Sequence, residues 1–129
     1  MDIDSFWEYG DPAASEARFR AALDAAEGDD RLELLTQLAR TYSLRAQFAT
    51  AHAVLDRVEQ QLGSAGVRPQ LRYLLERGRT INSSGAPEQA RALFVAAWEK
   101  AQAAGAVDVA GLAVDAAHMV AITYASAPE

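Results

Sequence analysis

The sequence predicts an all-α fold, and three observations carry this prediction. The 129 residues include 29 alanines but only 16 β-branched residues. Alanine favours helices, whereas β-branched residues favour strands. Apolar residues recur at the three- and four-residue spacing of one helix face. The chain has no two-residue hairpin signal and no sustained alternation of apolar and polar residues. We therefore expect a single domain of helices joined by short turns, with neighbouring helices antiparallel.

The first two predicted helices have recognisable start signals. Asp11 can cap the first helix and Pro12 suits its first position, with Gly28 ending the run. Asp29 and Asp30 can then cap the second helix, whose apolar residues follow at helical spacing.

Four more helices are predicted beyond these. The third spans about residues 49–62, and the sequence GSAGVRP at 63–69 breaks it. A fourth follows this break, and a fifth occupies about 87–104, before Gly105. The sixth is expected at about 107–124.

The predicted helices repeat in pairs. The sequence GDPAASEARFRAA, from Gly10, matches GAPEQARALFVAA, 75 residues later, and a related segment lies between them. Each of the three segments has a small residue at the same position, and these residues, Ser15, Ala51 and Ala90, are separated by steps of 36 and 39 residues. The partner helices repeat at an offset of 39, at these matched positions: Leu35 with Leu74, Leu38 with Arg77, Ala39 with Gly78, and Tyr42 with Ile81. We expect the small residues to permit close helix crossings.

This pattern resembles the tetratricopeptide repeat, whose common form has 34 residues. The longer steps are similar to the extended repeats of kinesin light chain and its bacterial relatives. The resemblance covers nearly the whole chain and implies an α-solenoid, a right-handed superhelix of about three and a half helix pairs. Residues 1–28 would form a partial first repeat, 29–66 the second, 67–105 the third, and 106–129 the first helix of an incomplete fourth.

Both ends of the chain fit this scheme. Ile3, Phe6 and Trp7 fall on the remnant of a first helix, where they would form a hydrophobic cap or an aromatic peptide-binding patch. The sequence Ala-Pro-Glu at 86–88 recurs at 127–129, as if another helix were beginning. We expect either a fragment of a longer repeat protein or a last helix covered by a second copy.

The resemblance implies that the first helix of each pair lines a concave groove. The eight residues expected to face it are Glu33, Thr36, Arg40, Ser43, Arg72, Leu75, Arg79 and Asn82. An arginine guanidinium matches the geometry of a carboxylate, so the groove would bind acidic or C-terminal carboxylate groups of a protein or peptide partner. Alternatively, these arginines pair internally, Arg72 with Glu76 and Arg40 with Glu33, which would leave the groove neutral.

The last predicted helix is apolar around most of its circumference, which is typical of a helix buried on more than one side. We expect self-association there, as a possible homodimer. The residues concerned are Leu112, Met119, Val120, Ile122 and Tyr124.

Composition excludes several other functions. The chain has no cysteine, and its net charge of −6 argues against nucleic acid or an anionic membrane as a partner. No uninterrupted apolar run approaches the ~18 residues of a membrane span, and no signal peptide is apparent, so we expect a cytoplasmic protein. His52 and Asp56 lie one turn apart but are too few for a metal site.

We find no enzyme signature, cofactor motif or metal site. The sequence favours a protein-interaction scaffold. The alternatives are a peptide-sensing domain of a larger signalling or transcription regulator, and a structural homo-oligomerisation module.

Overall fold

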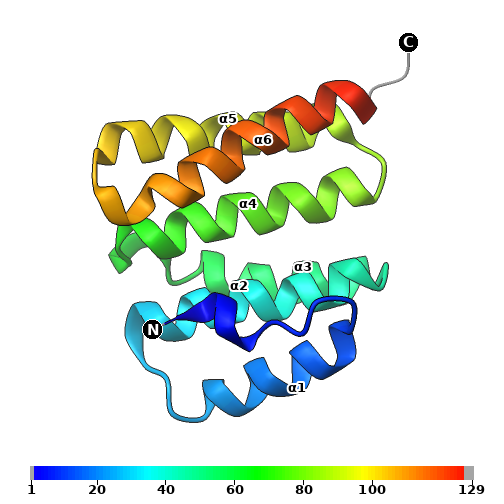
Figure 1. Ribbon diagram of the computed structural model, residues 1–129, viewed down its shortest axis with the longest axis vertical. Coiled ribbons are helices and arrows are strands. Elements are labelled where there is room, and N and C mark those ends of the chain that lie inside the picture. Colours follow the sequence, from blue (N-terminus) through cyan, green and yellow to red (C-terminus); the bar gives the residue numbers. More distant parts are fainter. Residues whose placement is uncertain (1, 127–129) are drawn as a thin grey trace.

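The computed structural model describes residues 2–126 and is helical throughout, which confirms the all-α prediction (Figure 1). The described elements are α1 (Pro12–Leu23), α2 (Gly28–Leu44), α3 (Phe48–Glu59), α4 (Val67–Ser83), α5 (Pro87–Ala104) and α6 (Ala110–Ser126), with the 3-10 helices η1 (Ile3–Phe6), η2 (Leu62–Ser64) and η3 (Val107–Val109).

The six α-helices stack along the long axis of the molecule, from α1 at one end to α5 and α6 at the other (Figure 1). Each packs antiparallel against its neighbour in the chain, as the short turns predict. In addition, α2 contacts α4, and α4 contacts α6. The alternate helices α2, α4 and α6 therefore lie next to one another.

Several predicted helix ends are confirmed. The Asp11 Oδ1 atom accepts a hydrogen bond of 3.0 Å from the N–H of Ala14, so Asp11 caps α1 as expected. The bounds of α5 agree with the prediction, and Gly105 ends this helix with a φ of +63°, in the left-handed region that favours glycine.

The prediction for Asp29 and Asp30 was wrong. Both lie inside the first turn of α2, which begins at Gly28, and neither caps the helix. The Asp29 Oδ2 atom instead accepts a hydrogen bond of 3.0 Å from the N–H of Gly66, in the loop before α4. A carboxylate in the first turn is still favoured by the helix dipole, and here it also anchors a neighbouring loop.

The break predicted at 63–69 is shorter than expected, because α4 begins at Val67. Pro69 lies in the first turn of α4, where the missing proline N–H has no partner to lose. The preceding helix α3 ends earlier than predicted, at Glu59, and η2 follows it.

The close helix crossings expected at Ala39 and Gly78 are present. Ala39 is fully buried, and a Cβ atom added at Gly78 would lie 2.5 Å from Cε1 of Phe94 on α5. The Phe94 ring, itself fully buried, therefore packs directly on the backbone of α4.

The N-terminal segment packs into the hydrophobic core that it shares with α1, α2 and α3. Ile3 and Trp7 are buried, and the Trp7 ring packs edge-on against Phe19 with 5.1 Å between ring centroids. The indole N–H of Trp7 donates a 3.0 Å hydrogen bond to Gln37 on α2. This arrangement corresponds to the cap, since the buried Trp7 ring leaves little aromatic surface for a peptide.

The Ala-Pro-Glu sequence at 127–129 lies outside the described residues. Within them, one helical segment, Val107–Ala125, is long and apolar enough to span a membrane by length and composition alone. This differs from the expectation that no apolar run reaches membrane-spanning length, because the segment includes Asp108 and Asp115 within an otherwise apolar sequence. Core helices of soluble proteins can have the same length and composition.

Candidate functional site

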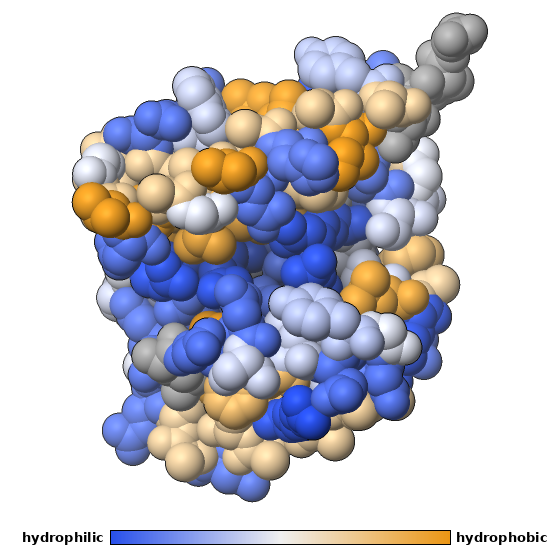
Figure 2. Space-filling model, in the orientation of Figure 1, coloured by the Kyte–Doolittle hydropathy of each residue, from blue (hydrophilic) through white to orange (hydrophobic). Residues whose placement is uncertain are grey.

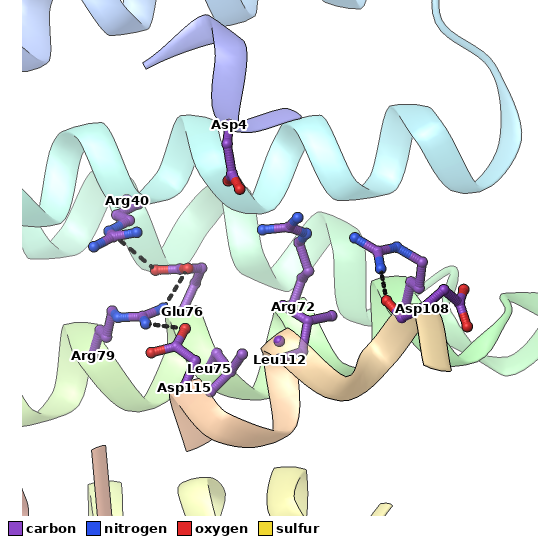
Figure 3. A pocket seen from close by; sticks show the side chains of 11 residues that line it. Asp4, Arg40, Arg72, Leu75, Glu76, Arg79, Asp108, Leu112 and Asp115 are labelled. Atoms are coloured by element: carbon purple, nitrogen blue, oxygen red, sulfur yellow. Dashed lines mark hydrogen bonds and ion pairs between the residues drawn. The ribbon is translucent and has the colours of Figure 1, made fainter. Parts of the chain in front are cut away.

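A solvent-open pocket of about 320 Å³ lies where α2, α4 and α6 meet near the N-terminal segment (Figure 3). In the space-filling view a hydrophilic band crosses this middle part of the molecule (Figure 2). Four arginines line the pocket, namely Arg40, Arg68, Arg72 and Arg79. The other lining residues are Asp4, Leu75, Glu76, Asp108, Gly111, Leu112 and Asp115.

Two buried carboxylates hold these arginines in place, and Glu33 is the first. Its Oε1 atom accepts from the Nε of Arg72 at 2.9 Å and from the Nε of Arg68 at 3.3 Å. Arg68 also donates to the backbone carbonyl of Asp108, ahead of α6. Glu33 therefore anchors two arginines of α4 to α2.

Glu76 is the second carboxylate. Its Oε2 atom accepts from Nη1 of Arg79 at 2.7 Å and from Nε2 of Gln37 at 3.1 Å. Its Oε1 atom is buried without a hydrogen-bond partner, with the Nε of Arg40 3.9 Å away. One polar network thus runs from Trp7 through Gln37 and Glu76 to Arg79.

Arg79 is the most tightly held of the four arginines. Besides Glu76 it donates to the carboxylate of Asp115 on α6. Burial disfavours the charged form of Arg79, but these two carboxylates outweigh burial and raise its pKa. Arg79 therefore joins α4 to α6, and each of its two Nη groups already has a carboxylate partner.

Arg40 and Arg72 differ, because each keeps unused hydrogen-bond donors. A guanidinium has five N–H donors. Arg72 uses its Nε on Glu33, and its two Nη groups have no partner among the described residues. Arg40 forms no hydrogen bond there, and its guanidinium carbon lies 5.3 Å from the centroid of the Trp7 ring. Both guanidinium groups extend from α2 and α4 toward the pocket (Figure 3).

Four carboxylates line the same pocket and balance its four arginines, namely Glu76 and three aspartates. Asp4 extends toward the pocket from η1, Asp108 precedes α6, and Asp115 already pairs with Arg79 (Figure 3). The pocket therefore offers both cationic donors and anionic acceptors. A polar ligand with an acidic group beside N–H donors would match this arrangement better than a purely anionic one.

The eight residues predicted to face the groove do not all reach this pocket. Arg40, Arg72, Leu75 and Arg79 line it, and Glu33 supports it from behind. The other three do not line it: Thr36 is fully buried, Ser43 is buried, and Asn82 has a buried Oδ1 atom without a hydrogen-bond partner.

The groove arginines do pair internally, but both of the predicted pairs have other partners. Arg72 pairs with Glu33 and not with Glu76, while Arg40 lies near Glu76 and not near Glu33. Sequence reasoning also missed Gln37 and Arg68. The signal for Gln37 was present, since the offset of 39 places it level with Glu76.

His52 belongs to a different cluster, on α3. Its Nδ1 atom lies 2.7 Å from Nη1 of Arg77 on α4, and Arg77 also donates to Asp56 at 2.6 Å. Burial and the Arg77 charge lower the pKa of His52. No group of three or more metal-ligating side chains comes together within residues 2–126. Arg77 instead ties α4 to α3.

Comparison with protein-family models, with curated proteins and with solved structures finds no match for this chain.

Proposed function

We propose that this chain is an α-solenoid of the tetratricopeptide type that binds an acidic or carboxylate-ending segment of a partner protein in the pocket between α2, α4 and α6. Support for the repeat comes from two contacts between α2 and α4. Glu33 bonds to Arg72 and Gln37 bonds to Glu76, and both pairs are 39 residues apart. This separation equals the offset of the sequence copies, so equivalent positions of successive copies lie side by side.

The unused donors of Arg40 and Arg72 carry the binding proposal. The Nη donors of Arg40 and Arg72 have no partner among the described residues, so water or a ligand must accept from them. A terminal carboxylate fits the planar donors of Arg72, with Arg40 beside it. The peptide N–H groups that precede the carboxylate can then donate to Asp4 or Asp108. This accounts for acceptors and cations on the same surface.

The experiment is a fluorescence anisotropy titration with a panel of labelled pentapeptides that end in Asp or Glu. Each peptide is compared with its C-terminally amidated form. We expect binding by the free carboxylates, and a loss of about tenfold in affinity with Arg40→Gln, since a charged hydrogen bond contributes about 1.5 kcal/mol. Arg40 is chosen because its loss leaves no hydrogen bond broken inside the domain.

The matched control is Arg18→Gln. Arg18 is an exposed arginine whose ion pair with Glu8, at 2.7 Å, lies apart from the pocket residues. This variant removes the same charge and should leave affinity unchanged. Equal affinity of Arg40→Gln and the wild-type protein would refute the pocket as the site, and no binding across the panel would refute the carboxylate as the ligand.

A further inference from the structure

The surface of η3 and α6 together shows a seven-residue periodicity. The inward positions are Val109, Ala116 and Thr123, each seven residues from the next and each buried. On the opposite side six apolar residues are all exposed, and we call them the outer stripe: Val107, Ala110, Val114, Ala117, Ala121 and Tyr124. In the space-filling view, small and hydrophobic side chains cover much of α6 (Figure 2).

The spacing within the outer stripe is three, four, three, four and three residues. This is the heptad pattern by which one helix packs along another. Val107 is 92 % exposed, Val114 71 % and Tyr124 64 %, so the largest members of the stripe are mostly exposed. The pattern therefore specifies a helix as the missing partner.

We propose that the outer stripe pairs with the same stripe of a second copy of this chain, with the two α6 helices antiparallel. In such a pair, a residue at the first position of a heptad on one helix faces a residue at the fourth position of a heptad on the other helix. Val107 then faces Tyr124 of the second copy, Ala110 faces Ala121, and Val114 faces Ala117. Apart from the two ends, every contact sets an alanine against an alanine or a valine, so the helices can approach closely.

Charges favour this orientation. The positions that flank the stripe are Ala106, Gly111, Ala113, His118, Val120 and Ala125, and none of them is an aspartate, glutamate, lysine or arginine. A second copy therefore meets no like-charge repulsion along the seam. At the C-terminal end of α6 the Arg91 guanidinium lies 3.6 Å from the Tyr124 ring centroid. Antiparallel pairing sets this cation toward the Asp108 end of the other copy, whereas parallel pairing sets like charges of the two copies beside each other.

The surface beside the stripe has room for a partner. A groove of about 340 Å³ lies between α5 and α6, lined by Val95, Trp98, Glu99, Ala117 and Val120. The Trp98 side chain is 42 % exposed there. Exposed aromatic rings next to an apolar seam are typical of interface cores.

Of the residues predicted for self-association, Tyr124 lies on the stripe, while Leu112, Met119 and Val120 pack against the buried core that α4, α5 and α6 share. Ile122 is partly buried.

The first test is sedimentation equilibrium at tens of micromolar, with Val114→Glu and a control variant, Ala53→Glu. Ala53 is an exposed alanine on α3, so the control adds the same charge outside the stripe. We expect dimers for the wild-type protein and for Ala53→Glu. Val114→Glu should raise the dimer dissociation constant at least tenfold, because it buries a carboxylate in the seam. A monomeric wild-type protein, or equal dimerisation of both variants, overturns the proposal. So does a monomer that co-sediments with neutral phosphatidylcholine vesicles, which would make a membrane the occupant.

The second test fixes the orientation. The chain has no cysteine, so single cysteines report only the contact being tested. Ala110→Cys and Ala121→Cys are oxidised separately and as a mixture. Antiparallel pairing predicts disulfide-linked dimers mainly in the mixture. Equal cross-linking of each variant alone would indicate parallel pairing and overturn the proposed register.

Discussion

The contact between Gly78 and Phe94 offers the sharpest test of the helix packing. Replacing Gly78 by alanine adds one methyl group in the middle of α4. That methyl group would lie 2.5 Å from Cε1 of Phe94 and 2.9 Å from two further ring atoms. Contacts this short do not occur in folded proteins, and the ring is fully buried, so either α4 and α5 separate or the ring leaves its rotamer.

Two opposing effects set the magnitude. Alanine is favoured over glycine inside a helix by about 1 kcal/mol. Overpacking of a buried contact costs about 1–3 kcal/mol, and a clash with a fixed aromatic ring belongs at the upper end of that range. We therefore expect Gly78→Ala to lower the free energy of unfolding by about 1–2 kcal/mol. For a domain of this size that corresponds to a Tm lower by roughly 3–10 °C.

The assay is urea and thermal unfolding followed by circular dichroism, with two comparison variants. Gly111→Ala is the control, since a Cβ atom there has nothing within 4 Å and the variant should be neutral or slightly stabilised. Phe94→Leu is destabilising alone, but it should reduce the cost of Gly78→Ala when the two are combined. A Gly78→Ala protein as stable as wild type, or a double variant that shows simple additivity, would refute the close crossing.

Two further predictions concern titrating groups outside the pocket. Burial and Arg77 lower the pKa of His52 below about 6.5, so the unfolded chain takes up this proton first. Its contribution to stability is full above that pH and declines as the pH falls below it. His52→Gln keeps an acceptor for Arg77 and should flatten the Tm profile between about pH 6.5 and 5. Hydrogen bonds from Arg20 and Arg45 lower the pKa of Glu16, whose contribution is present above about pH 4.5 and lost in acid. Glu16→Gln should cost about 1 kcal/mol at pH 7 and progressively less as the pH falls below 4.5, as measured by urea unfolding. An unchanged profile for either variant would contradict the corresponding contact.

Local signals predicted much of the fold. The cap at Asp11 and the left-handed Gly105 depend on residues within a turn of each other, so they are visible in the sequence. The small residue at Gly78 was also correctly interpreted, because repetition marked it. Asp29 was misassigned because its partner, Gly66, is 37 residues away. An aspartate side chain can either cap a helix or anchor a distant loop, and the local sequence is the same in both cases.

The pocket was less predictable for a related reason. Helical spacing placed Arg40, Arg72 and Arg79 on one face, and all three line the pocket. It could not assign their partners, because a long arginine side chain can reach carboxylates on two neighbouring helices. Arg79 reaches both Glu76 on its own helix and Asp115 on α6. Only the three-dimensional arrangement shows that Arg40 and Arg72 keep unused donors.

The two proposed surfaces use different residues of α6. Asp115 faces α4 and helps to enclose the pocket, whereas no member of the outer stripe lines it, although Gly111 lies beside both surfaces. An antiparallel dimer would join two pockets in one particle. A partner with two binding segments could then gain about 100-fold or more in apparent affinity through effective concentration. The two proposals can be refuted independently of each other. Val114→Glu should abolish this gain while leaving the affinity for a single pentapeptide unchanged, whereas Arg40→Gln should weaken pentapeptide binding without altering the dimer.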